Sequence, residues 1–219
     1  MSERFLIFGH RGSPRTHPEN TVASFEETLR VGADGFETDL RLLSDRVAIL
    51  YHDDELDDDD IETLSSKQFH ERRGDIVPLA DLAAFAARTT MILEVKRSKW
   101  EEALLEHVAA WADVIVASFD HSAVAELARR QAPFPLGLTV FGYVVDLAAY
   151  AARLGATWLF PNYRFVDAEL VASLHERDIR VVPWTPNRER EWQRLRELGC
   201  DGVITDRPGD AVRWRNDER

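Results

Sequence analysis

The sequence predicts an α/β fold, a parallel (β/α)8 TIM barrel that forms a single domain over residues 1–219, with a small hairpin extension after the second strand. Eight apolar, strand-like segments alternate with amphipathic, helix-like segments, as parallel strands with helical crossovers require. The length of 219 residues is common for one closed barrel. A doubly wound open sheet is the alternative that the same alternation allows.

The predicted strands are short β-branched or apolar runs bounded by turn residues. They comprise residues 5–8, 35–40, 91–95, 114–117, 136–140, 158–160, 180–183 and 202–205.

The predicted helices fill the gaps between these strands. Three of them end in a glycine, Gly32, Gly155 or Gly199, as a repeated helix-to-strand turn would, and this repetition favours one domain over two. The helices comprise residues 20–31, 79–87, 100–111, 122–130, 145–154, 168–176 and 190–198, and a short tail over 209–214 is expected to close the ring.

Residues 42–52 interrupt the alternation. A turn signal at Ser44 and Asp45 precedes another short apolar run, which predicts a hairpin that extends the second strand. Four aspartates at 57–60 then indicate an exposed acidic loop. A calcium loop is the less favoured interpretation, because the glycine and glutamate spacing of such a loop is missing.

Composition excludes several classes of protein. Hydrophobic residues make up 45% and charged residues 30%, which is typical of a globular chain, and no apolar run approaches the roughly 20 residues of a membrane span. The net charge of −12 argues against binding to nucleic acid and against stable association with anionic membranes. Cys200 is the single cysteine, which excludes an internal disulfide and a thiolate zinc site. The N-terminus resembles no signal peptide, so a cytoplasmic protein is expected.

The basic residues are 24 arginines and three lysines, beside 39 acidic residues. A GC-rich coding bias with an ordinary acidic surface is the favoured interpretation of this balance. Adaptation to a high-salt cytoplasm is the alternative, because salt screens the repulsion between dense carboxylates.

Three carboxylates fall near the C-terminal ends of two predicted strands. Glu37 and Asp39 share one face of the second strand, and Glu94 shares a face with Lys96 on the third. Buried carboxylates in one place need a compensating cation. Salt bridges to arginine could supply it, but a divalent cation, Mg²⁺ or Ca²⁺ with Mn²⁺ also possible, suits three oxygen ligands better.

Two histidines, His10 and His52, follow the first strand and the predicted hairpin, on the same side of the barrel as the carboxylates. A histidine pair can divide acid and base work near neutral pH. Arg11 and Lys96 add fixed positive charge suited to a phosphate group.

Nine short motifs then resemble the glycerophosphodiester phosphodiesterase family in order and spacing, from about residue 5 to residue 208. They are His10-Arg11-Gly12, Pro18-Glu19-Asn20-Thr21, Gly32-Ala33-Asp34, Glu37-Thr38-Asp39, His52-Asp53, Val77-Pro78-Leu79, Leu93-Glu94-Val95-Lys96, Trp184-Thr185 and Gly202-Val203-Ile204-Thr205-Asp206-Arg207-Pro208.

The resemblance implies roles for the matching residues. It implies that Glu37, Asp39 and Glu94 hold the metal, that His10 and His52 are the acid–base pair, and that Arg11 and Lys96 contact phosphate. Trp184 resembles an aromatic residue at the barrel rim that packs on the substrate, and Asn20 is expected to cap or brace the first loop. Only 25 residues separate His52 from Pro78, so the inserted lid common in the family is expected to be short or missing.

The expected reaction is metal-dependent hydrolysis of a glycerophosphodiester to glycerol phosphate and an alcohol. A phospholipase-type phosphodiesterase acting on lipid is one alternative, although no sequence segment looks like an apolar or basic membrane-facing rim. A non-catalytic phosphodiester-binding protein is the other. The sequence predicts neither the leaving alcohol nor the oligomeric state.

Overall fold

The computed structural model describes residues 4–74 and 76–217, and eight parallel strands form its barrel. The absence of a signal peptide was predicted from the N-terminus, of which residues 1–3 lie outside the described part. The barrel strands are β1 (Leu6–Gly9), β2 (Gly35–Leu42), β6 (Thr90–Val95), β7 (Val114–Ser118), β8 (Leu136–Val140), β9 (Trp158–Pro161), β10 (Arg180–Val181) and β11 (Gly202–Thr205).

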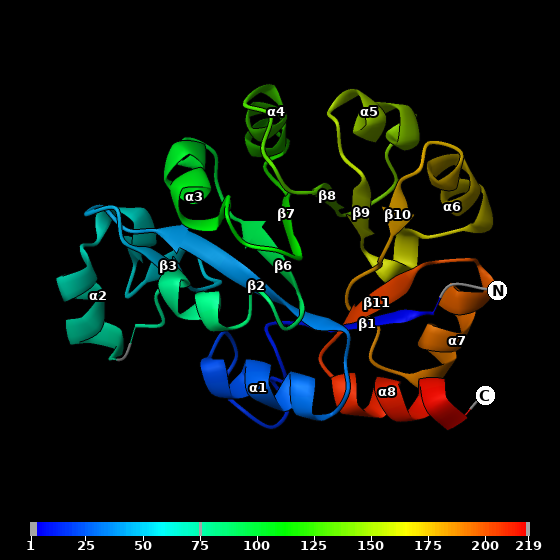
Figure 1. Ribbon diagram of the computed structural model, residues 1–219, viewed down its shortest axis with the longest axis horizontal. Coiled ribbons are helices and arrows are strands. Elements are labelled where there is room, and N and C mark those ends of the chain that lie inside the picture. Colours follow the sequence, from blue (N-terminus) through cyan, green and yellow to red (C-terminus); the bar gives the residue numbers. More distant parts are fainter. Residues whose placement is uncertain (1–3, 75, 218–219) are drawn as a thin grey trace.

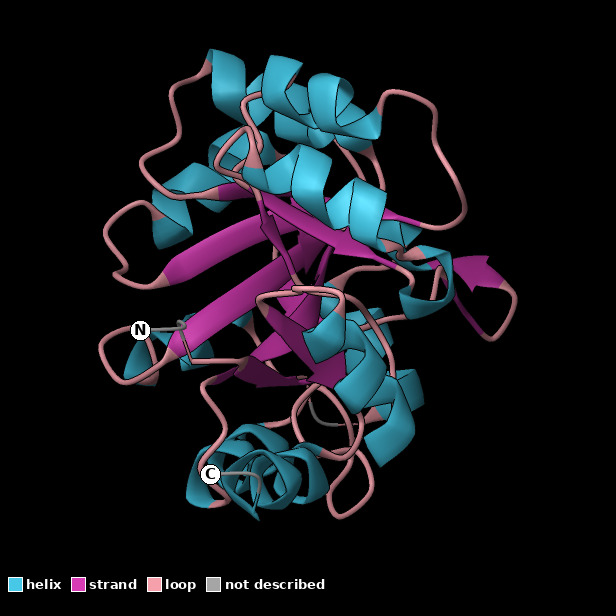
Figure 2. Cartoon of the chain, turned by 90° about the vertical axis from the view of Figure 1, so that its right-hand side faces the viewer, coloured by secondary structure: helices cyan, strands magenta, loops and turns pink. Residues whose placement is uncertain are grey.

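The sheet follows the order β10-β9-β8-β7-β6-β2-β1-β11, so strands adjacent along the chain are neighbours in the barrel. The ring is nearly closed at β10 and β11, where the backbone N–H of Ile204 donates to the carbonyl of Pro183 (2.9 Å). Helices lie outside the strands, as Figures 1 and 2 show. The predicted barrel is therefore confirmed, and the open-sheet alternative is wrong.

The helices lie close to their predicted positions. One difference is the segment after Pro78, which forms the 3-10 helix η2 (Leu79–Ala84) where an α-helix over 79–87 was expected. The helices after the barrel strands are α1 (Val22–Arg30), α3 (Glu101–Val108), α4 (His121–Arg129), α5 (Leu147–Arg153), α6 (Ala168–His175), α7 (Glu189–Glu197) and α8 (Pro208–Asp217), with a 3-10 turn η3 (Tyr163–Phe165) after β9.

The repeated glycine turn has a backbone reason. Gly32 and Gly199 follow the last residues of α1 and α7 and have φ values of 85° and 89°, a region that side chains with a Cβ rarely adopt. Each glycine therefore lets the chain leave its helix and turn into the next strand.

Alternation along the strands divides the core into two layers. Ile7 and Val203 point outward against the helices, whereas Phe8 and Ile204 point into the barrel, where they pack with Ile92. All five side chains are buried. The interior is filled with side chains, so the cavity described below lies over a packed floor.

The predicted hairpin is present: β3 (Ala48–Leu50) pairs antiparallel with the end of β2. Residues 53–77, of which residue 75 lies outside the description, were expected to leave a short or missing lid. This short segment forms a second hairpin, a 3-10 turn and a helix, which pack Ile61 and Phe69 onto Leu43 and Ile49. These elements are β4 (Glu55–Leu56), β5 (Asp59–Asp60), η1 (Ile61–Thr63) and α2 (Ser66–Arg73), beside β3 at the left of Figure 1.

The aspartate run at 57–60 comprises a tight turn and β5, and Asp57, Asp58 and Asp59 are exposed as expected. Asp57 and Asp58 have φ values of 52° and 66° and connect β4 to β5, while Asp60 accepts the backbone N–H of Glu62. Aspartate tolerates this left-handed conformation better than most residues. The sequence showed the acidic turn but not the short strands on each side of it.

Candidate active site

A cavity of about 270 Å³ opens among the C-terminal ends of the barrel strands. This is the end at which the loops after parallel strands meet, and it is where barrel enzymes build their sites. The lining residues are His10, Arg11, Glu37, Asp39, His52, Ile92, Glu94, Lys96, Ala117, Phe119, Thr139, Phe160, Trp184 and Ile204. All eight residues predicted for the site are among them.

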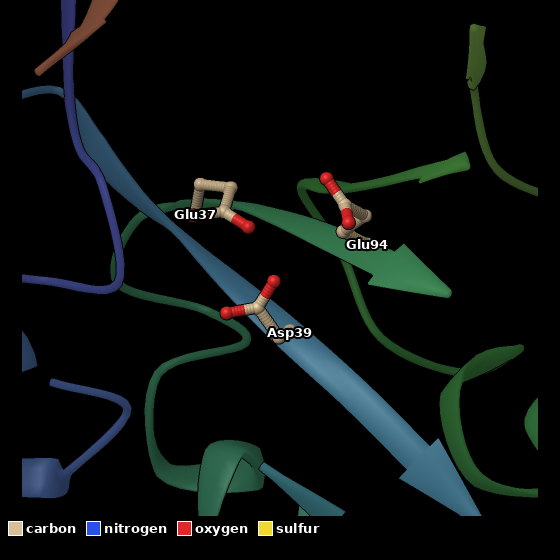
Figure 3. A group of neighbouring side chains, drawn as sticks. All are labelled: Glu37, Asp39 and Glu94. Carbon is tan, nitrogen blue, oxygen red and sulfur yellow. The ribbon is translucent and has the colours of Figure 1, made fainter. Parts of the chain in front are cut away.

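Glu37, Asp39 and Glu94 come together on two adjacent strands (Figure 3). Asp39 of β2 is the direct neighbour of Glu94 on β6, and Glu37 lies two residues earlier on the same face as Asp39. One carboxylate oxygen from each lies within 4.8 Å of the others. Three hard oxygen donors at this spacing form a candidate site for a divalent cation.

Two cationic side chains contact this group. The Lys96 ammonium lies 2.5 Å from Asp39 Oδ1 and is also hydrogen-bonded to Glu94, and Arg11 Nε lies 3.1 Å from Asp39 Oδ2. Glu37 Oε2 accepts the backbone N–H of Arg11 (3.0 Å), and no ion pair joins Glu37 to a side chain in residues 4–74 and 76–217. The salt-bridge interpretation thus accounts for Asp39 and Glu94 but leaves Glu37 uncompensated.

The pKa values of the carboxyl groups separate accordingly. Burial raises the pKa of Glu37 to about 8, and the charge of Asp39 adds to this effect. Burial also acts to raise the pKa of Asp39, but the charges of Lys96 and Arg11 outweigh it and bring the pKa to about 2. The site therefore holds a carboxyl group that needs a further positive partner to ionise at neutral pH.

His10 is held by a pair of polar side chains from the other end of the chain. Its Nδ1–H donates to Asp206 Oδ1 (2.7 Å), and Asn187 Nδ2 donates to Asp206 Oδ2 (2.7 Å). Burial opposes the charged imidazole, but the hydrogen bond to Asp206 and the charge of Glu37 raise the pKa of His10 above its usual value. These contacts leave Nε2 of His10 available to a bound substrate.

His52 follows the β2–β3 hairpin, and Arg41 fixes its backbone. The Arg41 guanidinium is buried, and its Nη2 donates to the carbonyl of His52 (2.8 Å) and to Asp54 Oδ1 (2.6 Å). The Nδ1–H of the His52 ring donates to Asp53 Oδ1 (2.8 Å). Both histidines thus use Nδ1 to hold an aspartate, which is a common way to fix a tautomer.

The first loop is braced by Asn20 and not capped by it. Asn20 Nδ2 donates to Asp39 Oδ2 (2.9 Å), and Asn20 Oδ1 accepts from the Thr38 hydroxyl (2.8 Å). The N-cap of α1 is Thr21. Asn20 is therefore part of the support of the carboxylate group.

The supporting roles of Asp206, Asn187 and Arg41 were not predicted from the sequence. Asp206 lies in a quoted motif, but its role depends on β11 being next to β1 in the barrel. Arg41 carries a weak signal, because it continues the Glu37, Asp39 alternation on β2 and so faces the same side of the sheet.

The opposite wall of the cavity is apolar and continues onto the surface. Trp184 donates its ring N–H to the carbonyl of Phe160 (2.9 Å) and lies edge-to-face with Phe119 at 5.5 Å between ring centroids. Phe141 and Tyr143 lie farther out and are 68% and 73% exposed. An exposed apolar group therefore lies at the cavity mouth, and it combines the segment 141–145 after β8 with Phe119 and Trp184 from the loops after β7 and β10.

Comparison with known proteins identifies the class of protein to which this fold and site belong. The family model described as glycerophosphoryl diester phosphodiesterase family matches residues 10–75 and 86–210. The chain belongs to this family, which confirms the resemblance and the enzyme class inferred from the motifs, that of glycerophosphodiester phosphodiesterases.

Individual relatives match over nearly the whole chain. A glycerophosphodiester phosphodiesterase of Bacillus altitudinis is 30% identical over 96% of this chain and 98% of its own length. Another from Caldanaerobacter subterraneus subsp. tengcongensis is 26% identical over 94% and 96%.

Solved structures share the fold. A putative glycerophosphoryl diester phosphodiesterase from Silicibacter pomeroyi has a TM-score of 0.89 at 20% identity and covers 100% of this chain and 95% of its own. An Oleispira antarctica phosphodiesterase, solved with the product sn-glycerol-3-phosphate, has a TM-score of 0.84 at 22% identity, over 97% and 96% of the two chains. Within residues 4–74 and 76–217, no helix is long and apolar enough to cross a bilayer.

Proposed function

We propose that this cavity hydrolyses glycerophosphodiesters to glycerol phosphate and an alcohol, with one divalent cation and two histidines. The observation that carries the proposal is the convergence of three carboxylates, two histidines, Arg11 and Lys96 on one cavity. The family membership and the names of the relatives support the same reaction.

Glu37, Asp39 and Glu94 are the proposed ligands of the cation. Their oxygen donors suit Mg²⁺ or Ca²⁺, with Mn²⁺ as a third candidate. The uncompensated carboxyl of Glu37 supports a cation beyond Lys96 and Arg11. When bound, such an ion acts as a Lewis acid on a phosphate oxygen.

Arg11 and Lys96 are the proposed phosphate contacts. Both line the cavity, and each is anchored to Asp39, so their positive charge is fixed near the place where negative charge develops on the phosphate oxygens. Together with a bound cation and one protonated histidine, Arg11 and Lys96 would give the cavity the local positive potential that lets a chain of net charge −12 take an anionic substrate.

His10 and His52 are the proposed proton donor and acceptor, with Nε2 of each ring left to act. In the net reaction, the bond from phosphorus to the leaving oxygen breaks, a bond from phosphorus to a water oxygen forms, and a proton goes onto the leaving alkoxide. The first nucleophile is either water or the neighbouring glycerol hydroxyl, which would give a cyclic phosphate. The family resemblance favours the hydroxyl, and equal cleavage of a substrate lacking it would contradict that route.

The test of this proposal is release of glycerol phosphate from glycerophosphocholine and glycerophosphoglycerol. We expect EDTA to abolish release and added Mg²⁺, Mn²⁺ or Ca²⁺ to restore it. Glu94→Gln should lower metal affinity and turnover by about tenfold or more. Glu101→Gln, a change at a buried glutamate outside the cavity, is the matched control and should leave both unchanged.

Two outcomes would contradict the proposal. Turnover that survives complete chelation would remove the cation from the reaction. Substrate binding by the folded protein without any turnover would instead support the non-catalytic phosphodiester-binding protein. We also propose that the protein is cytoplasmic, acts on a small-molecule substrate and has no nucleic-acid partner.

A further inference from the structure

An aromatic surface begins inside the cavity and runs out along the barrel mouth. We call it the aromatic rim and define it as Phe119, Trp184, Phe141, Phe165 and Tyr143. Phe119 and Trp184 line the cavity, and Trp184 lies 6.1 Å from Phe141 between ring centroids. Phe165 then lies 5.3 Å from Phe141 and 5.2 Å from Tyr143. The rim is therefore one continuous path of ring contacts from the substrate cavity to solvent.

The outer part of the rim is unusually exposed for an apolar surface. The loop after β8 places Phe141, Tyr143, Val144 and Val145 in five consecutive residues, and Val145 is 88% exposed. Exposed apolar side chains in one group usually mark a binding surface. Its continuity with the cavity indicates that the ligand of this surface is part of the substrate.

The cavity itself divides into a polar half and an apolar half. Glu37, Asp39, Glu94 and Lys96 form the polar half, whereas Trp184 and its neighbours Phe119 and Phe160 form the apolar half. The hydroxyl groups of a glycerol arm match the polar half. The other arm of the same diester is left facing the aromatic rings.

We propose that the leaving alcohol of this enzyme carries a single hydrocarbon chain, which lies along the aromatic rim. This inference rests on the proposed function and names its substrate class: glycerophosphodiesters with one bare glycerol arm and one arm bearing a chain. Lysophosphatidylglycerol has this pattern. The bond from phosphorus to the acylglycerol oxygen breaks, water supplies the new oxygen on phosphorus, and the products are glycerol phosphate and a monoacylglycerol.

The charge of the protein favours a dispersed single-chain substrate over a membrane surface. The net charge of −12 repels anionic lipid surfaces. A hydrocarbon chain that moves from water onto the aromatic rings gains binding free energy in proportion to its buried area.

The experiment compares lysophosphatidylglycerol, kept below its micelle concentration, with glycerophosphoglycerol, which differs from it only by the acyl chain. We expect kcat/KM to be roughly tenfold or more higher for the chain-bearing substrate, equivalent to about 1.4 kcal/mol. The double variant Phe141→Ser, Tyr143→Ser should lose this preference and keep its turnover of glycerophosphoglycerol. Val22→Ser, a change at an exposed apolar side chain on α1 outside the rim, is the control and should keep the preference.

The outcomes separate this inference from the proposed function. Equal kcat/KM for the two substrates would overturn the chain site and leave the phosphodiesterase intact. Release of acylglycerol phosphate and glycerol would overturn the assignment of the arms. A preference that appears only with lipid vesicles, together with vesicle binding lost in the double variant, would replace the chain site by a membrane-docking surface. Failure to cleave either substrate would count against the proposed function itself.

Discussion

At the scale of the residue, the site depends on side chains that orient its histidine and carboxylate groups through hydrogen bonds and ion pairs. Asp206 orients His10 and is itself held by Asn187, and Asn20 and Lys96 hold Asp39. Such supports fix ring orientation and protonation state before a substrate arrives. The acid–base chemistry should therefore respond to changes in residues that never touch the substrate.

Asp206→Asn should move the pH profile of turnover. The hydrogen bond and charge of Asp206 help to raise the pKa of His10 against the opposing effect of burial, so their loss lowers that pKa. The limb of the kcat/KM profile that reports the ionisation of His10 should shift to lower pH by about one unit. The direction is the same whether His10 donates or accepts the proton. Steady-state kinetics from pH 5 to 9, a range of about two units on each side of neutrality, measures the shift.

Asp201→Asn is the matched control, because Asp201 pairs with His175 (3.0 Å) outside the cavity. It should leave the profile in place. A profile that does not move in Asp206→Asn, despite full folding, would show that the protonation of His10 does not limit turnover.

At the scale of the element, the β2–β3 hairpin delivers His52 to the cavity. Arg41 lies at the end of β2 and connects the hairpin to the small group of elements that follows it, through the His52 carbonyl and the carboxylate of Asp54. The buried guanidinium of Arg41 therefore helps to fix the position of His52.

Arg41→Met should lower kcat by about tenfold with a smaller change in KM, because a misplaced proton-transfer group affects the reaction more than binding. Methionine retains most of the volume, so the fold should persist. Arg41→Lys should recover part of kcat, since an ammonium can still donate to the His52 carbonyl. Arg72→Met removes the ion pair with Asp59 (2.6 Å) in the same region and is the control. Equal loss of kcat in Arg41→Met and Arg72→Met would indicate general loosening and contradict a specific role for Arg41.

The sequence predicted the barrel because each strand is a short apolar run and each helix ends at a recognisable turn. It predicted the eight site residues because Glu37, Asp39 and Glu94 follow strand alternation and because the motifs resemble a known family. It did not predict the aromatic rim, since Phe119, Phe141 and Trp184 approach each other only when three loops meet at the barrel mouth. The α2 region was missed for a related reason, because its few apolar residues form a core only with the hairpin.

At the scale of the whole molecule, many arginines pair with acidic side chains on the surface. Arg88 binds Glu26 through two hydrogen bonds, and Arg97 lies within ion-pairing distance of Asp54, Asp60 and Glu62. Such pairs neutralise neighbouring carboxylates locally, and the excess of acidic residues behind the net charge of −12 remains on the surface. The ordinary acidic surface remains the favoured interpretation, with adaptation to high salt as the alternative.

The protein should therefore stay folded at low ionic strength. We expect a cooperative thermal transition at about 10 mM KCl, where charges act over roughly 30 Å, with a midpoint close to that in molar KCl. Differential scanning calorimetry across this range tests the expectation. Unfolding on removal of salt, reversed by molar KCl, would support the high-salt alternative.

We expect the two histidines at the cavity to transfer protons in phosphodiester hydrolysis. Glycerol phosphate release from glycerophosphoglycerol by His10→Ala and His52→Ala tests it most directly, with His175→Ala as a control at a histidine outside the cavity. We expect each cavity variant to fold and its kcat to fall by a factor of about 10² to 10⁴, with the control unchanged. Unreduced turnover in either His10→Ala or His52→Ala would contradict it.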